Sequence, residues 1–141
     1  MRRTTTHIPP ADHRLFLRCR ALNEAIRRAE GDIDTLRSLP LYALGSLLDQ
    51  DLPGDERRKI QRLLKRIDEE TARLNTTRAE LDELACEAEK AAQRIQSDGL
   101  RRFVRLFCFD GMTYTEAVNG CGACPSSGKR YAALIRTQPI E

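Results

Sequence analysis

A seven-residue repeat between residues 54 and 97 constrains this 141-residue chain more than any other feature of its sequence. Apolar side chains fall seven residues apart at Ile60, Ile67, Leu74, Leu81, Ala88 and Ile95. Such a repeat keeps an apolar seam on one side of an α-helix, which then supercoils with a partner. At about 1.5 Å per residue this helix would be roughly 60 Å long. It therefore needs an equally long partner surface.

An earlier segment, from Ala11 to Ser38, carries a shorter seam of the same kind. Its apolar residues are spaced by threes, fours and sevens, at Leu15, Leu22, Ile26, Ala29, Ile33 and Leu36. Pro40 ends this helix, residues 41–48 predict a short apolar helix, and Pro53-Gly54 predicts a turn. We expect the two long helices to pair antiparallel, and a homodimer to cover the remaining seam. A monomeric bundle is the alternative.

The composition excludes several classes of protein. With 40% hydrophobic and 32% charged residues, the chain is typical of long solvated helices. No apolar run approaches the roughly 18 residues of a membrane span, and the first residues lack the apolar segment of a signal peptide. We therefore expect a cytoplasmic protein with no membrane partner. There is no glycine-rich phosphate loop and no histidine with a plausible nucleophile, so we expect no enzyme activity and no cofactor.

Residues 99–137 predict three short helices separated by glycine turns, the pattern of a helix-turn-helix. Gly111 is placed to end the first helix. Thr113 and Glu116 have the spacing of a capping box at the start of the second. Pro125 suits the first turn of the third. Gly128 within that third helix should cost about 1 kcal/mol relative to alanine.

The net charge of +3 is unevenly distributed along the chain. Residues 1–40 and 99–141 each carry a net charge of about +3, whereas residues 41–98 carry about −3. A basic end next to an acidic middle is what a DNA-contacting head on a helical stalk would show, because phosphate contacts are local. A second basic cluster, at residues 57–66, is more simply a solvated helix face.

A family resemblance is carried by the C-terminal region, at Phe107, Asp110-Gly111-Met112-Thr113-Tyr114-Thr115-Glu116-Ala117-Val118, Gly122 and Lys129-Arg130. These residues resemble the promoter-reading C-terminal region (region 4) of sigma-70-type factors. They are more closely similar to the small phage and prophage regulators of the ArpU and RinA kind, in which such a helix-turn-helix follows a charged coiled coil. The resemblance covers about a quarter of the chain.

The resemblance implies a phage or prophage transcription regulator that binds double-stranded DNA in the host bacterial cytoplasm. RNA polymerase is a further partner that it allows. The side chains expected to face base edges are those of Ser126, Ser127, Lys129 and Arg130. Arg130 is the best candidate for a bidentate hydrogen-bond contact with a guanine. The side chains expected to hold phosphates are those of Arg101, Arg102, Thr113, Tyr114 and Arg136.

The sequence thus predicts an all-α fold in which a long helical hairpin or coiled coil precedes a small three-helix helix-turn-helix head. The expected parts are a flexible arm (1–10), a stalk (11–98), the head (99–137) and a tail (138–141). One alternative function is a coiled-coil structural or adaptor protein, for example associated with packaging, whose head binds protein. Another is a small zinc module using Cys108, Cys121 and Cys124, although the odd, irregular set of five cysteines favours reduced thiols and no metal.

Overall fold

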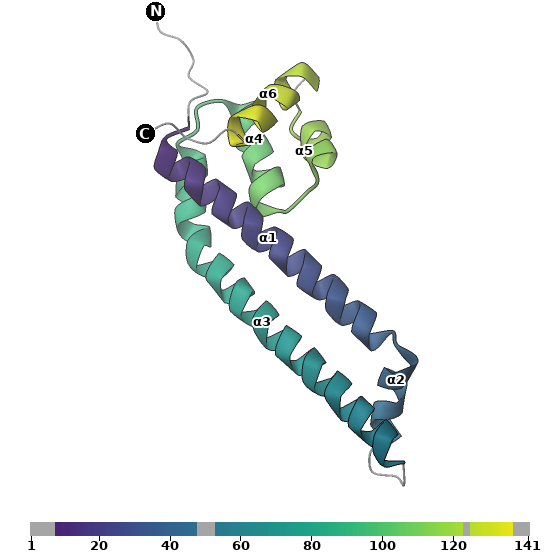
Figure 1. Ribbon diagram of the computed structural model, residues 1–141. Helices are drawn as coiled ribbons and strands as arrows, with labels where there is room; N and C mark the ends of the chain where they lie inside the picture. Colours follow the sequence, from purple (N-terminus) through teal and green to yellow (C-terminus); the bar gives the residue numbers. More distant parts are fainter. Residues whose placement is uncertain (1–7, 48–52, 123–124, 137–141) are drawn as a thin grey trace, which may run out of the picture. The chain divides into compact units, whose positions relative to one another are not determined.

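The computed structural model describes residues 8–47, 53–122 and 125–136, and it describes the backbone alone for Ser46, Leu47, Pro125, Ser126 and Arg136. Within these ranges the chain is helical and contains no strand, so the predicted all-α class is confirmed (Figure 1). The elements are α1 (Pro10–Arg37), α2 (Pro40–Ala43), η1 (Leu44–Leu47), α3 (Gly54–Gln93), α4 (Asp98–Val104), η2 (Arg105–Phe109), α5 (Tyr114–Gly120) and α6 (Pro125–Arg136).

Local interactions explain where α1 begins and ends and where α3 begins. Pro10 is the first residue of α1, where its missing amide hydrogen costs nothing. At the other end the amides of Ser38 and Leu39 bond back to carbonyls of the last turn before Pro40. The first turn of α3 contains Asp55 and Glu56, whose charges complement the positive end of the helix dipole. Residues 1–7 of the predicted arm, the predicted tail (138–141), and residues 48–52 of the loop before α3 lie outside the described residues.

The chain divides into two compact units, which are considered separately. The hairpin unit comprises Ala25–Ala79, and the head unit comprises Met1–Glu24 together with Glu80–Glu141. The unit boundaries thus fall inside α1 and α3, not at the beginning of the small helices.

In the hairpin unit the end of α1 and the beginning of α3 run antiparallel, joined through α2 and η1 (Figure 1). Leu36, Leu63 and Ile67 form its buried apolar cluster, with Leu41 of α2 packed against it. Thr71 and Arg78, two polar residues of α3 between the apolar heptad positions, have partners within the same unit. The Thr71 hydroxyl donates to the Ile67 carbonyl at 2.7 Å. Arg78 pairs with Glu30 of α1 at 2.8 Å.

The head unit has one core, to which the start of α1, the end of α3 and the three C-terminal helices all contribute. Phe16 of α1 and Phe103 of α4 are fully buried, and Ala91 and Ala92 of α3 let the other helices approach closely. Five of the six heptad residues are buried, and the sixth, Leu81, is half-buried. The seam is therefore covered within the chain, by α1 and α2 in the hairpin unit and by α1 and the small helices in the head unit.

A π-helical turn, η2, follows α4 and is where the first small helix ends. Its widened geometry is seen in the bond from the Asp110 amide to the Arg105 carbonyl, at 2.9 Å. Gly111, at φ 70°, then turns the chain into the left-handed region. The prediction that Gly111 ends this helix is confirmed.

Two side chains of α1 satisfy carbonyls that the end of η2 leaves free. The Asn23 amide donates to the carbonyls of Cys108 and Phe109 at 2.7 and 2.9 Å. The guanidinium of Arg20 donates to the carbonyls of Phe107 and Met112 at 2.8 and 2.6 Å. It also lies over the Phe107 ring, 4.1 Å from its centroid. Because unpaired buried carbonyls are costly, these bonds hold η2 against α1.

A capping box begins α5, and a glycine turn follows it. The capping box predicted at Thr113 is present: its hydroxyl accepts from the Glu116 amide, and the Glu116 carboxylate accepts from the Thr113 amide. Gly122, at φ 77°, lies in the turn after α5.

The helices α5 and α6 pack closely at Gly128. A Cβ on Gly128 would lie 2.6 Å from Cγ1 of Val118. The expectation that Gly128 only weakens its helix is corrected, because glycine here permits the close approach of α5 and α6.

We predict that Gly128→Ala destabilises the protein by about 1–3 kcal/mol, because the added methyl group collides with Val118. Urea unfolding followed by circular dichroism measures this. The matched control is Gly31→Ala in α1, where an added Cβ has no atom within 4 Å. That change should stabilise by about 0.5–1 kcal/mol. Adding Val118→Ala to Gly128→Ala should recover part of the loss, and equal stabilisation by both alanines would contradict this account of Gly128.

Candidate nucleic-acid interface

The helix α6 places two adjacent cations on its outer side. Tyr131 and Ile135 are buried in the head core, whereas Lys129 and Arg130 are exposed. The guanidinium of Arg130 lies 5.8 Å from the centroid of the Tyr131 ring, which is within the range of a cation–π contact. Neither Lys129 nor Arg130 forms a salt bridge with a carboxylate of the described part of the chain. Their charges are thus available to an external anion.

The other residues predicted to contact DNA from α6 are half-buried or have side chains outside the described part of the chain. Ser127, in the first turn of α6, is half-buried and already has an interaction partner. The side chain of Ser126 lies outside what the structure describes, and so does the side chain of Arg136 at the other end of the helix. Of the four base-contacting candidates, Lys129 and Arg130 are therefore the two whose exposure is established.

Arg102 of α4 lies beside the turn between α5 and α6. Its Nη1 donates to the Cys121 carbonyl at 3.0 Å. A Cβ on Gly122 would lie 2.5 Å from the same nitrogen, so glycine leaves room for the guanidinium. Arg102 remains exposed and has no carboxylate partner among the described salt bridges. It therefore holds the turn and still presents positive charge next to it.

The remaining predicted phosphate contacts have structural roles. Arg101 donates to the Ile95 carbonyl at 3.0 Å and pairs with Asp98, also at 3.0 Å. The Thr113 hydroxyl is occupied as the cap of α5. Tyr114 is half-buried against the head core and has an interaction partner. A phosphate contact from these three would be additional to bonds that already stabilise the head, and it stays a prediction.

His13 of α1 fixes the end of α6, a role that the sequence did not reveal. Its Nε2 donates to the Ile135 carbonyl at 2.6 Å, in the last turn of α6. His13 is buried, and its Nδ1 has no hydrogen-bond partner among the residues that the structure describes. The two residues are 122 positions apart in the chain, so no local motif links them. His13 therefore helps to set the position of the α6 backbone in the head.

The thiols considered for a zinc site lie in apolar surroundings. Burial raises the pKa of Cys108 to about 12, although the charge of Arg20 acts in the opposite direction. The Cys121 thiol is buried and donates to the Val118 carbonyl at 3.3 Å. Cys124 lies outside the described residues. Among those that are described, no three histidine, cysteine, aspartate or glutamate side chains are grouped as metal ligands would be.

Comparison with known proteins gave no match to a family model, a curated protein or a solved structure. Across the described residues, none of the helices has both the length and the apolar character needed to cross a membrane.

We predict that the buried thiols resist alkylation in the native protein. At pH 8 a thiol with a pKa of about 12 is ionised in about one molecule in ten thousand, and only the thiolate reacts rapidly. Iodoacetamide should therefore modify the exposed Cys86 well before Cys108 and the buried Cys19. Peptide mapping by mass spectrometry identifies the modified residues. Denaturation should abolish the difference, and native alkylation of Cys108 at the rate of Cys86 would contradict the described burial.

Proposed function

We propose that this protein is a sequence-specific DNA-binding transcription regulator of the phage type. In this proposal α5 and α6 act as a helix-turn-helix resembling that of sigma-70 region 4, and α6 enters the major groove. The observation that supports it best is the pair of exposed cations on the face of α6 opposite its buried side, Lys129 and Arg130, which form no salt bridge within the described residues.

The proposed contacts follow from the chemistry of the exposed groups. The planar guanidinium of Arg130 can donate two parallel hydrogen bonds to O6 and N7 of a guanine. Lys129 and the serines at the start of α6 would contact neighbouring base edges. Arg102, exposed beside the turn before α6, is placed to meet a phosphate as α6 approaches the groove. The fixed attachment of α6 at Val118 and at His13 limits its motion, which favours a defined docking geometry.

A regulator of this kind would act in the cytoplasm without enzymatic activity, and RNA polymerase is a further partner that we propose for it. A homodimer is favoured by one argument, which is that two heads would bind a two-part DNA site. The long heptad seam does not favour a homodimer, because five of the six heptad residues are buried within one chain. Light scattering of the protein with and without selected DNA distinguishes one bound copy from two.

The test of the function is selection from a random-sequence DNA duplex library. The full-length protein should enrich one sequence over successive rounds, and that duplex should then bind more tightly than scrambled DNA. Specific binding typically exceeds nonspecific binding by a factor of about 10³ or more. Failure to enrich any sequence would refute sequence-specific binding, whatever the affinity for bulk DNA.

We predict that Arg130→Ala weakens binding to the selected duplex by about 1–3 kcal/mol, which is about 5-fold to 150-fold. The loss arises because one guanidinium would supply both bonds to a guanine. Fluorescence anisotropy at fixed salt measures the affinity. The matched control is Arg28→Ala, which removes an exposed arginine from α1 in the hairpin unit and should leave binding unchanged. Equal affinities of the Arg130 variant and the wild type would contradict the base-contact role.

We predict that Arg102→Ala weakens binding to the selected duplex and binding to nonspecific DNA to a similar degree. It should also reduce the slope of log K against log salt by about 1, as expected for one lost phosphate contact. Arg102→Gln separates charge from structure, because glutamine keeps a donor for the Cys121 carbonyl but has no charge. Its salt slope should match that of the alanine variant. A wild-type slope with glutamine would show that Arg102 acts on the turn and not on phosphate.

A second candidate function, a helical adaptor that binds protein, is favoured by one observation. Leu39, directly before α2, and Tyr42, within α2, are large apolar side chains of the hairpin unit that are 41% and 37% exposed. An adaptor would use this surface for a partner protein. It predicts no enriched DNA sequence, and it predicts that the double change Leu39→Ser and Tyr42→Ser abolishes partner binding without altering the fold.

A further inference from the structure

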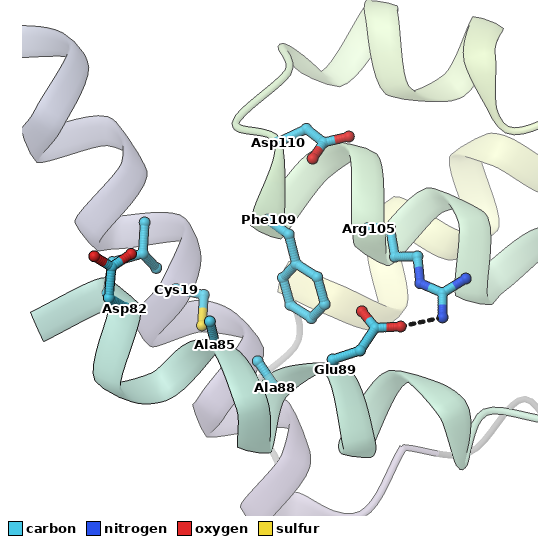
Figure 2. A pocket seen from close by; sticks show the side chains of 9 residues that line it. Cys19, Asp82, Ala85, Ala88, Glu89, Arg105, Phe109 and Asp110 are labelled. Atoms are coloured by element: carbon cyan, nitrogen blue, oxygen red, sulfur yellow. Dashed lines mark hydrogen bonds and ion pairs between the residues drawn. The ribbon is translucent and has the colours of Figure 1, made fainter. Parts of the chain in front are cut away.

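A cavity of about 480 Å³ lies within the head unit, and none of its lining residues belongs to α6 (Figure 2). Its lining comes from α1, the later part of α3, and the π-helical turn η2 with the residue that follows it. The volume falls in the range of small-molecule sites, about 300–1,000 Å³. Nothing in the proposed DNA contacts uses this cavity.

The apolar part of the cavity wall is held in place by surrounding packing. Cys19 of α1 and Ala88 of α3 are each 1% exposed, so this part of the wall is made of closely packed side chains. Phe109 projects from η2 toward this wall (Figure 2). Its ring lies 5.9 Å from the Phe16 ring, and its carbonyl accepts from Asn23. The π-helical turn therefore presents an aromatic face that is already oriented, and such turns are frequent at functional sites.

The charged part of the wall is acidic. Glu89 pairs with Arg105, as the dashed line in Figure 2 shows. Asp82 and Asp110 form no salt bridge with the described arginines and lysines, so the lining carries a net charge of −2. The cavity is thus a local acidic site, and it disfavours anions.

The two unpaired carboxylates come from different elements. Asp82 belongs to α3, whereas Asp110 follows η2, and Figure 2 shows them apart with apolar side chains nearby. A single metal ion requires ligands that converge on one point, which this arrangement does not provide. A molecule with two separated positive charges and an apolar middle matches it better.

We propose that this cavity binds aliphatic diamines and polyamines. One ammonium group lies against the Asp82 carboxylate and another against the Asp110 carboxylate. The methylene chain between them covers Ala85, Ala88 and the Phe109 ring. Methylene stems pack on apolar surfaces while their charged ends stay solvated. The proposal does not rest on DNA binding, since none of the cavity residues belongs to α5 or α6.

The test is isothermal titration calorimetry of the full-length protein without DNA, at low and constant ionic strength. The probes are spermidine and 1,5-diaminopentane, with 1-aminopentane and 1,5-pentanediol as controls of the same chain length. We expect saturable binding of one diamine per chain, weaker binding of the monoamine and none of the diol. Equal heats for the diamine and the diol, or no saturable heat with either diamine or spermidine, would overturn the proposal.

Three variants locate the site. Asp82→Asn and Asp110→Asn should each weaken diamine binding by about fivefold, the scale of one partly exposed ion pair. The matched control, Asp68→Asn, removes an exposed carboxylate from α3 in the hairpin unit and should leave the affinity unchanged. An equal loss in the Asp68 variant would mean general attraction of cations, which overturns the proposal. So would wild-type affinity in the double variant of Asp82 and Asp110.

Filling the cavity tests the apolar half of the proposal without changing charge. Ala85 lines the cavity and is exposed, so Ala85→Leu adds volume there without disturbing the buried core. The variant should fold normally by circular dichroism and lose diamine binding. Unaltered binding in the folded Ala85→Leu variant would show that the ligand does not occupy this cavity.

Discussion

The head unit depends on the burial of the apolar face of α4 between α1 and α3. Leu100, Phe103 and Val104 are fully buried, and they meet side chains from the start of α1, the end of α3 and the later part of α6. A helix of seven residues has little stability in isolation. Its stability comes from this packing, and the positions of α5 and α6 follow from it.

Polar bonds then determine how the small helices are oriented on that core. Apolar contacts favour burial but specify direction weakly, whereas an unpaired buried carbonyl is costly. Arg20 and Asn23 satisfy the carbonyls at the end of η2, and His13 satisfies one at the end of α6. All three donors belong to α1. The first helix therefore contributes both a core surface and the hydrogen bonds that fix where the C-terminal helices end.

Gly128 shows why a residue cannot be assessed from its own helix alone. Intrinsic propensity counts glycine as a cost within a helix, and the sequence offers no sign that Val118 lies opposite. In the folded chain a methyl group at this position would overlap Val118, so glycine permits the contact between α5 and α6. The same limit applies to Arg102. Its charge suggested a phosphate contact, but its bond to the Cys121 carbonyl is visible only in the folded head.

The sequence by itself determined the features that depend on neighbours within a few residues. The heptad repeat predicted the long helix α3, and Gly111 and Thr113 predicted the boundaries between small helices. Only the tertiary structure decided what covers the heptad seam, which α1 side chains hold the head, and how Phe109, Asp82 and Asp110 come to share one cavity. These contacts join residues far apart in the chain, and their free energy depends on packing and desolvation that no local pattern encodes.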